Sequence, residues 1–467
     1  MPGTLCRHAP RLRIGPKWGK ITVRCGADSV GAWLEVYDNG IGMSTAVLTD
    51  VLLDFGSSYW NTDAMLADHP GLLASGFQPI GQFGIGFFSA FMWGEPVQVI
   101  TRRYSDGAAE THVLEFKSGL DISAVLRKAR PDEARHVQDG GTLVRLRMKE
   151  SRYSRFSYPL DIGEAFPENP LKNAELLRQL CRMLAPAIDV DLFVEGERGD
   201  RERIVAAGDW QRIERWELLL RLVGESASSA SSELVKQAKL EAGRLRPIIA
   251  DDQSCLGLAC LESLASPDDP TLVGQLVIKG FLAESTSNLL GVVFGDPSQA
   301  SRSRATPKAK DEVLRRWASE QAKVAIGVVP PGEKQFAIAS VIYGLGCDTG
   351  PLPICLGAES PLTAAEVSGR RWDSEVWLIP PGVDIDLAKT PNALIVGDDV
   401  TRLFGWTSDD ESLESLVIKC VATAWGYDPE QIRVTEPRPF PGTKSRFKMI
   451  CKPEPETLPP TEPARAS

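Results

Sequence analysis

The sequence has few of the residues that build metal or redox sites. It contains only four histidines, and its nine cysteines include no CxxC pair. An odd number of scattered cysteines is typical of reduced thiols in a cytoplasmic protein rather than of a disulfide framework. Catalysis by a metal bound to His or Cys is therefore disfavoured.

Long apolar runs and an excess of positive charge are also missing. No segment approaches the ~20 apolar residues that a membrane-spanning helix requires. The chain has 52 Lys and Arg against 62 Asp and Glu, a net charge of -10. Binding nucleic acid requires a local surplus of cations. We therefore expect neither a membrane nor a nucleic-acid partner, and the length of 467 residues predicts two or three domains.

The first third of the chain contains the clearest structural patterns. β-branched and aromatic residues cluster or alternate over 21–24, 32–37, 97–101 and 142–148, which predicts strands. A helix is predicted from Ser44 to Asp54, with Ser44 as its N-cap. A second, apolar helix is predicted within residues 81–92. Residues 56–80 lack periodicity, and long loops of this kind are often functional lids.

The later segments have weaker patterns, and a domain boundary is predicted near residues 151–167. Asn169 and Pro170 are typical of a helix start, and Thr306 with Pro307 predicts another helix start. Further elements are expected at 231–244 (helix), 276–278 and 289–294 (strands), 375–379 (strand) and 413–425 (helix). The last residues are rich in Pro, Glu and Thr, which predicts a disordered tail.

Three short motifs would each contact a purine nucleotide if one were bound between them. The first is Asp38 to Met43, DNGIGM, at a strand end. The Asp38 carboxylate can accept a hydrogen bond from the amino group of adenine, where guanine has no donor. Gly40 and Gly42 let the backbone turn sharply and approach the base. Met43 offers a polarizable surface to the purine ring.

The second and third motifs would bind the phosphates and the base edge. Gly81, Gly84 and Gly86 leave backbone amides able to point at phosphates, at the positive end of a helix. Thr142, which follows Gly141 into a strand, would offer its hydroxyl to adenine, directly or through water. Each motif alone is more often a turn or a packing feature. Their order around a lid-like loop favours a joint function.

Together the motifs resemble the ATP site of the heat-shock protein 90 chaperones, within the broader GHKL (Bergerat-fold) ATPase class. The matching segments are 38–43, 81–92 (GQFGIGFFSAFM) and 140–146. Gln82 and the continuation after Phe87 are most typical of the chaperone branch. The resemblance implies that Phe83 and Ile85 also belong to the nucleotide site, and that Phe87 closes over its phosphate side.

The same resemblance implies an α+β fold, ATP or ADP with Mg²⁺, a lid over about 53–80, dimerisation and client proteins. The first domain would be a two-layer sandwich of helices on a mixed sheet, followed by an α/β middle domain. The expected division is 1–155 for ATP binding, 165–327 for the middle domain, 328–450 for an unassigned domain and 451–467 for the tail.

The chain departs from this class at its start. A helix before the first motif normally supplies a Glu that activates water and an Asn that holds Mg²⁺, but Asp38 lies too close to Met1 for that helix. Glu35 is on the adjoining strand, where the geometry is wrong. Either the natural start lies upstream or the element is lost. ATPase activity is expected only if the helix exists, since hydrolysis requires both groups.

One catalytic residue is expected in the middle domain. Ser303 and Arg304, before the helix predicted at Pro307, resemble the arginine that neutralises charge on the γ-phosphate. The alternative is a solvated loop charge, because Arg302 fits nearly as well. The sequence thus predicts an ATP-binding chaperone, with a non-hydrolysing regulatory or scaffold protein as the alternative. A DNA-acting relative is disfavoured by the acidic charge.

Overall fold

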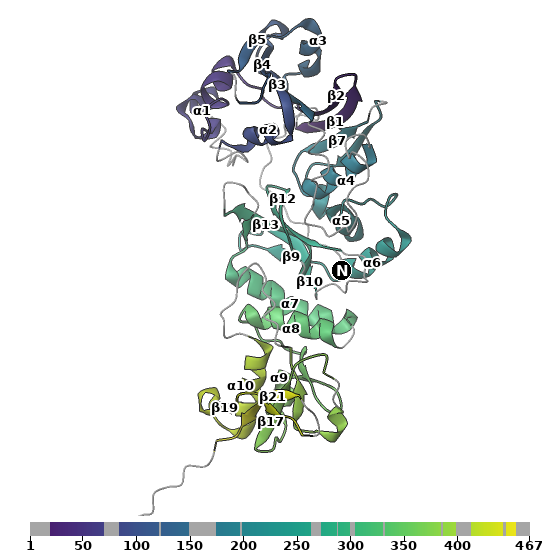
Figure 1. The fold of residues 1–467 in the computed structure, drawn as a ribbon, viewed down its shortest axis with the longest axis vertical. Coiled ribbons are helices and arrows are strands. Elements are labelled where there is room, and N and C mark those ends of the chain that lie inside the picture. Colours follow the sequence, from purple (N-terminus) through teal and green to yellow (C-terminus); the bar gives the residue numbers. More distant parts are fainter. Residues whose placement is uncertain are drawn as a thin grey trace, which may run out of the picture.

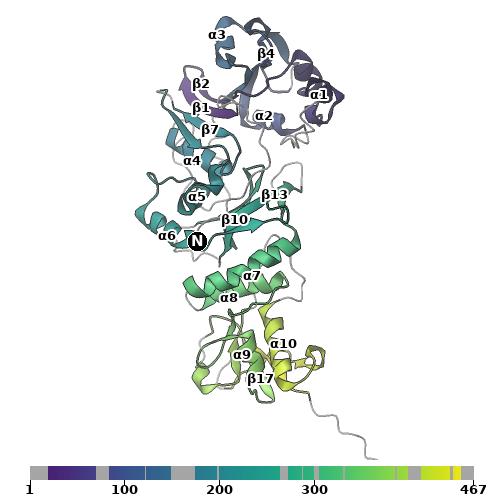
Figure 2. The same cartoon turned by 180° about the vertical axis from the view of Figure 1, so that it is seen from behind.

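The computed structural model describes residues 19–69, 84–120, 123–148, 174–196, 199–262, 272–286, 288–298, 304–329, 332–383, 386–397, 412–441 and 445–453. Three β-sheets with their helices follow one another along an elongated molecule (Figure 1). The reverse view in Figure 2 shows the same order, with the first sheet at one end and the third at the other. The predicted α+β fold is confirmed.

The first sheet has eight strands in the order β5-β4-β3-β6-β2-β1-β7-β8. Only the β1–β7 pair is parallel, so the sheet is mixed. The strands are β1 (Lys20–Asp28), β2 (Gly31–Asp38), β3 (Gly94–Arg102), β4 (His112–Phe116), β5 (Val125–Lys128), β6 (Gly141–Met148), β7 (Asp191–Glu195) and β8 (Arg201–Val205). The four strands predicted in this region are confirmed within β1, β2, β3 and β6.

Alternation along β3 buries side chains on both faces of the first sheet. Val97 and Val99 belong to the larger cluster, which also includes Leu48 and, from α4 (Ala174–Leu184), Leu177. Ile100 belongs to a smaller cluster on the other side. That cluster is completed from η6 (Arg135–Val137), which follows the short α3 (Pro131–Ala134).

Strands β7 and β8 come from residues that the sequence assigned to the middle domain. They extend the first sheet beyond β1, with Ile21 opposite Leu192 and Val23 opposite Val194. The first sheet therefore includes residues from both sides of the boundary predicted near 151–167. Asn169 and Pro170, the predicted start of the next helix, lie outside the described residues.

The second sheet has helices on both faces. Its strands are β9 (Arg246–Ile249), β10 (Cys255–Leu261), β11 (Gly274–Ile278), β12 (Phe281–Thr286), β13 (Leu289–Pro297) and β14 (Ala305–Pro307). One face packs on α5 (Arg215–Leu222) and α6 (Ser232–Ala242), and the other on α7 (Asp311–Val328), against which α8 (Glu333–Gly344) packs in turn. The predicted start of α6 is confirmed, because the Ser231 hydroxyl accepts a hydrogen bond from the Leu234 amide.

The helix start predicted at Thr306 and Pro307 is wrong. These residues form β14 and pair with Gly295 and Asp296 of β13, and α7 begins only at Asp311. Strand pairing overrides the local Thr-Pro signal here.

The third sheet continues the core of the second. Its strands are β15 (Pro353–Leu356), β16 (Pro361–Thr363), β17 (Glu375–Ile379), β18 (Ala393–Ile395), β19 (Arg433–Val434), β20 (Arg438–Pro439) and β21 (Arg446–Cys451), beside α9 (Ala364–Gly369) and α10 (Leu413–Trp425). The strand predicted at 375–379 and the helix predicted at 413–425 are confirmed. One buried cluster runs from Ile248 through α7 and α8 to Ile450, across the limit predicted at 327.

Shorter helical segments complete the described chain. They are η1 (Val47–Val51), η2 (Tyr59–Asn61), α1 (Asp63–Asp68), η4 (Gly86–Ser89), α2 (Ala90–Trp93), η5 (Ala108–Glu110), η9 (Asp209–Gln211), η10 (Leu387–Lys389) and η11 (Pro429–Gln431). The predicted cap Ser44 lies three residues before η1, and its hydroxyl accepts a hydrogen bond from the Val47 amide at 3.2 Å. None of the helices in the described ranges has the length and hydropathy to cross a bilayer.

Candidate functional site

The first and third motifs meet at one end of two inner strands of the first sheet, β2 and β6. Asp38 is the last residue of β2, and Thr142 is the second residue of β6. The two strands are antiparallel neighbours in which Asp38 lies directly opposite Thr142. The topology therefore brings the two side chains expected to contact the base onto adjacent strands.

The Asp38 carboxylate is held by its own turn. Its Oδ1 atom accepts a hydrogen bond from the Gly40 amide at 2.9 Å. Burial raises the pKa of Asp38, and the hydrogen bond from Gly40 opposes that rise. Removal from water disfavours the charged form of a carboxylate unless donors replace the lost hydration. This side chain is thus suited to accept a further N–H donor from a ligand.

The glycines of these two motifs are required by the protein's own backbone. Gly42 has φ +66°, and a Cβ there would lie 1.9 Å from the Arg102 carbonyl oxygen. Gly141 has φ +97°, and a Cβ there would lie 2.0 Å from the Asp38 carbonyl oxygen. Both positions thus need glycine for backbone conformation and for close strand packing.

A residue that sequence reasoning missed joins these motifs. Thr101 of β3 is completely buried and lies opposite Thr142 in the β3–β6 pair. Its hydroxyl accepts from the Met43 amide, donates to the Gly141 carbonyl and contacts the Thr142 hydroxyl, each at 3.0 Å. A lone threonine inside a strand has no sequence signal that could have identified it.

The second motif is described only in part. Gly81, Gln82 and Phe83 lie outside the described residues. Gly84 has φ +62°, and a Cβ there would lie 2.2 Å from the Ser57 carbonyl oxygen, so this motif packs on the segment predicted as the lid. At Gly86, by contrast, no atom of the described residues outside its own turn lies within 4 Å of the position of a Cβ.

The helix predicted across residues 81–92 is shorter than expected in its described part. Ile85 precedes η4, a turn of 3-10 helix over Gly86–Ser89, and α2 adds only Ala90–Trp93. Two such short segments supply much less aligned backbone dipole than one long helix.

Phe87 is part of an aromatic cluster beneath the second motif. Its ring centroid lies 5.6 Å from that of Phe91 and 5.7 Å from that of Phe116, a buried residue of β4. Phe88 extends the cluster to Phe55, with centroids 5.1 Å apart. The side chains of this motif therefore anchor it to the sheet and to the predicted lid.

Glu35 has a structural environment rather than a catalytic one. Its side chain is only 2% exposed, and it forms ion pairs with Arg145 of β6 and Arg24 of β1. The Arg145 Nε donates to the Glu35 carboxylate at 2.5 Å. A carboxylate held between two guanidinium groups is a poor general base, in agreement with the sequence interpretation.

Arg304 lies beside the second sheet. It is exposed and immediately precedes β14. Its carbonyl accepts hydrogen bonds from the amide and hydroxyl of Ser298, at 3.2 and 3.1 Å. These contacts fix the backbone and leave the guanidinium in solvent.

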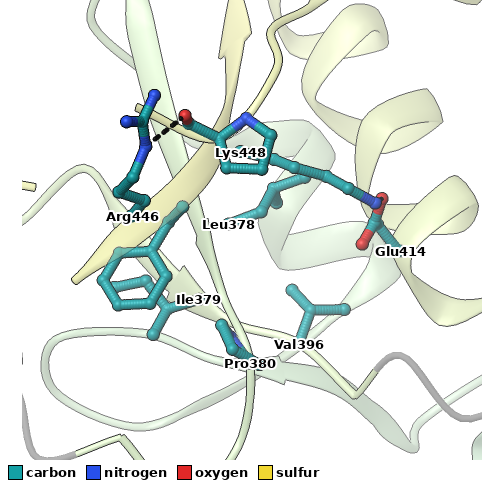
Figure 3. Close-up of a pocket in the computed structure, with 9 residues that line it drawn as sticks. Leu378, Ile379, Pro380, Val396, Glu414, Arg446 and Lys448 are labelled. Carbon is teal, nitrogen blue, oxygen red and sulfur yellow. Dashed lines mark hydrogen bonds and ion pairs between the residues drawn. The ribbon is translucent and has the colours of Figure 1, made fainter. Parts of the chain in front are cut away.

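A cavity of about 150 Å³ lies in the third sheet, which none of the three motifs reaches. It lies at the end of the pairing between β17 and β21, whose last pair is Leu378 with Lys448 (Figure 3). Pro380 has no amide hydrogen to continue that ladder. At the rim Lys448 contacts Glu414 at 2.7 Å, and the Arg446 Nε donates to the Pro437 carbonyl. The cavity is therefore separate from the predicted nucleotide site.

Comparison with known proteins relates part of the chain to one group of chaperones. No family model matches the chain. The Chaperone protein HtpG of Rhodospirillum rubrum is 26% identical over 196 residues, which cover 42% of this chain and 27% of the relative. HtpG of Alkalilimnicola ehrlichii is 33% identical over 202 residues, covering 42% and 27%. HtpG of Alcanivorax borkumensis is 42% identical over 131 residues, covering 26% and 21%.

The matches confirm the resemblance that the motifs predicted. Over the matched part, the chain is similar to HtpG chaperones of the heat-shock protein 90 family. It spans about a quarter of the length of the curated relatives that it matches first.

Proposed function

We propose that this chain, similar in part to the heat-shock protein 90 chaperones, binds an adenine nucleotide and acts as a molecular chaperone. In this proposal ATP closes the segment 53–80 as a lid and rearranges the domain that follows. The observation that carries it is the placement of Asp38 opposite Thr142, where the first and third motifs meet. The similarity to the HtpG proteins, which are named as chaperones, supports the proposed chaperone activity.

Adenine fits the chemistry of Asp38. The half-buried carboxylate accepts one backbone hydrogen bond, from Gly40. A second donor, such as the amino group of adenine, would replace the hydration that the carboxylate loses on burial. Guanine has an oxygen in that position and would repel the carboxylate. We therefore propose that Asp38 selects the base, with Gly40, Gly42, Met43 and Thr142 around it.

The phosphates would lie beside the second motif. Gly86 is exposed, and no distant part of the described chain crowds its Cβ position, so a phosphate could approach the backbone there. The described ranges contain no group of three His, Cys, Asp or Glu side chains able to hold a metal. Mg²⁺ would therefore enter with the nucleotide, since this ion often keeps waters and phosphate oxygens as ligands.

Binding without turnover is the second candidate function. Glu35 is buried in ion pairs with Arg24 and Arg145, so it cannot serve as the base that activates water. This observation favours a nucleotide-binding regulatory or scaffold protein. If ATP is hydrolysed, we propose Arg304 as the residue that neutralises the γ-phosphate.

The remaining parts of the proposal rest on the resemblance and on the patterns of the sequence. They are a cytoplasmic location, client proteins, a homodimer, and the division into domains at 1–155, 165–327 and 328–450. The shared core across residue 327 supports mechanical coupling between the last two of these.

Calorimetric titration of the full chain with ADP and with GDP, both with Mg²⁺, tests the proposed function. We expect heat of binding from ADP and little from GDP. Equal binding of the two would reject Asp38 as the selective group, and no binding of ADP would reject the nucleotide site itself.

A further inference from the structure

Thr101 is a buried hydroxyl whose function the motifs do not explain. It lies in the middle of the first sheet and has no exposed surface. Thr101 is paired with Thr142 on the neighbouring strand, so it lies directly beside a residue of the proposed base site. Burying a hydroxyl is costly unless its hydrogen bonds are made, so the bonds of Thr101 determine what it can do.

The three contacts of Thr101 use all of its hydrogen-bonding capacity. A threonine hydroxyl has one hydrogen and two lone pairs. The Gly141 carbonyl can only accept, so it takes the hydrogen of Thr101. The Met43 amide can only donate, so it occupies one lone pair. One lone pair remains for the Thr142 hydroxyl, 3.0 Å away.

The orientation of the Thr142 hydroxyl follows from this count. Since Thr101 has no hydrogen left to give, Thr142 must be the donor in the bond between them. Thr142 has only one hydroxyl hydrogen. Its oxygen therefore has only lone pairs to offer any other group.

We propose that Thr101 is a positioning residue that fixes the Thr142 hydroxyl as an acceptor toward the bound base. This inference rests on the proposed function and extends it to specificity. Asp38 and Thr142 would form a pair of acceptors on adjacent strands. Such a pair fits a base edge that carries an amino group. The amino group would donate to Thr142 directly, or through a water that donates to Thr142. A 6-oxo purine has an acceptor oxygen in place of that amino group and keeps a hydrogen only at its ring nitrogen N1, so it cannot donate to the pair from the amino position.

The experiment compares ADP with inosine diphosphate, which has an oxygen in place of the amino group. Thr101→Val keeps the shape of the side chain but removes its hydroxyl, so the Thr142 hydrogen becomes free to donate. We expect ADP affinity to fall about tenfold, the effect of one or two buried hydrogen bonds. The preference for ADP over inosine diphosphate should fall too, because Thr142 can then donate to the oxygen.

Three further variants separate this role from a structural one. Thr101→Ser keeps the hydroxyl and should retain both affinity and preference. Thr111→Val is a matched control, since Thr111 is also buried and its hydroxyl bonds only a local carbonyl, that of Ala108. In a double-mutant cycle, Thr101→Val should have little further effect on the ADP preference once Thr142 is alanine.

The outcomes distinguish this inference from the proposed function. If the unmodified chain binds no ADP, the proposed function fails and the inference fails with it. If the unmodified chain binds ADP but Thr101→Val weakens both nucleotides equally, Thr101 is only structural and the inference alone is overturned. Should Thr101→Val not fold, Thr101→Cys supplies a weaker donor of similar size, and its preference should lie between those of threonine and valine.

Discussion

Asp38 and Thr142 lie opposite each other in the antiparallel pair of β2 and β6, although they are far apart in the sequence. On the next strand, Thr101 lies opposite Thr142 and bonds to Met43. The first and third motifs are therefore joined through the sheet itself. The proposed base site depends on this register, since a shift by one residue would turn each side chain to the other face.

Gly141→Ala should destabilise the fold strongly. The φ of +97° is unfavourable for alanine, and its Cβ would lie 2.0 Å from the Asp38 carbonyl oxygen. We expect a loss of about 3 kcal/mol or more in the free energy of unfolding, from strain and the strand displacement together. Urea unfolding measures it. A loss below about 1 kcal/mol would mean that β2 and β6 are not packed as described.

Gly86→Ala is the contrasting change. Among the described residues, none outside its own turn lies within 4 Å of the added Cβ, so the free energy of unfolding should change by less than about 0.5 kcal/mol. If phosphates approach this backbone, ADP affinity should nevertheless fall. Measuring both quantities separates the two roles. Unchanged ADP affinity would remove Gly86 from the proposed site.

Glu35→Gln should affect stability and not nucleotide binding. Glu35 is 2% exposed, whereas Arg145 is 34% exposed and can recover part of its hydration. We expect a loss of about 2–3 kcal/mol, below the range for a fully buried pair. ADP affinity should stay within about twofold. If any ATPase activity were abolished while stability was retained, Glu35 would be catalytic and the structural assignment would be wrong.

Glu133 should make the fold sensitive to acid. Two hydrogen bonds of 2.7 Å from Arg127, with a further one from the Arg130 amide, lower the pKa of Glu133 from 4.5 to about 2. Its stabilising contribution is therefore present above about pH 4.5 and is lost as pH falls toward 2. That contribution is about 3 kcal/mol at most.

Glu133→Gln should flatten the fall in stability over this pH window and lower stability at neutral pH. Urea unfolding at several pH values between neutral and strongly acidic measures the slope. The exposed pair of Glu110 and Lys128 provides the control, because screening by solvent makes such pairs weak. An equal flattening by Glu110→Gln would contradict the assignment to Glu133.

Arg304→Ala should leave ADP affinity unchanged. Arg304 is exposed, and its two hydrogen bonds with Ser298 involve only its backbone carbonyl. If the chain hydrolyses ATP, turnover should fall at least about 100-fold, as for other arginines that stabilise phosphoryl transfer. Arg316→Ala, an exposed arginine on α7 that bonds to Ile249, is the control. Equal losses in both variants would count against Arg304.

Local patterns predicted much of this fold. Residues 375–379 form the expected strand and residues 413–425 the expected helix. Each was predictable because the residues that determine the element lie within the element itself. The pairing of β1 with β7 could not be predicted, since parallel pairing between distant segments has no local signature. At Thr306 the local signal for a helix start was overridden by pairing with Asp296.

The candidate site was predictable only where glycine and acid residues form a motif. Asp38 and Thr142 were found from their motifs, and the structure places them on adjacent strands. Thr101 was missed because its importance comes from the register of β3 and β6, which places it directly beside Thr142. The glycines were predicted to make room for a ligand. In the structure it is protein backbone that excludes a side chain at Gly42.

The most direct test of the account is ADP binding by Asp38→Asn beside Asp139→Asn, an exposed carboxylate near the same turn. Asparagine cannot offer the base a charged acceptor, so affinity should fall at least about 30-fold, as expected for a lost hydrogen bond to a charged group. Circular dichroism should show an intact fold, and Asp139→Asn should bind normally. Unchanged affinity in Asp38→Asn would contradict the proposed adenine site.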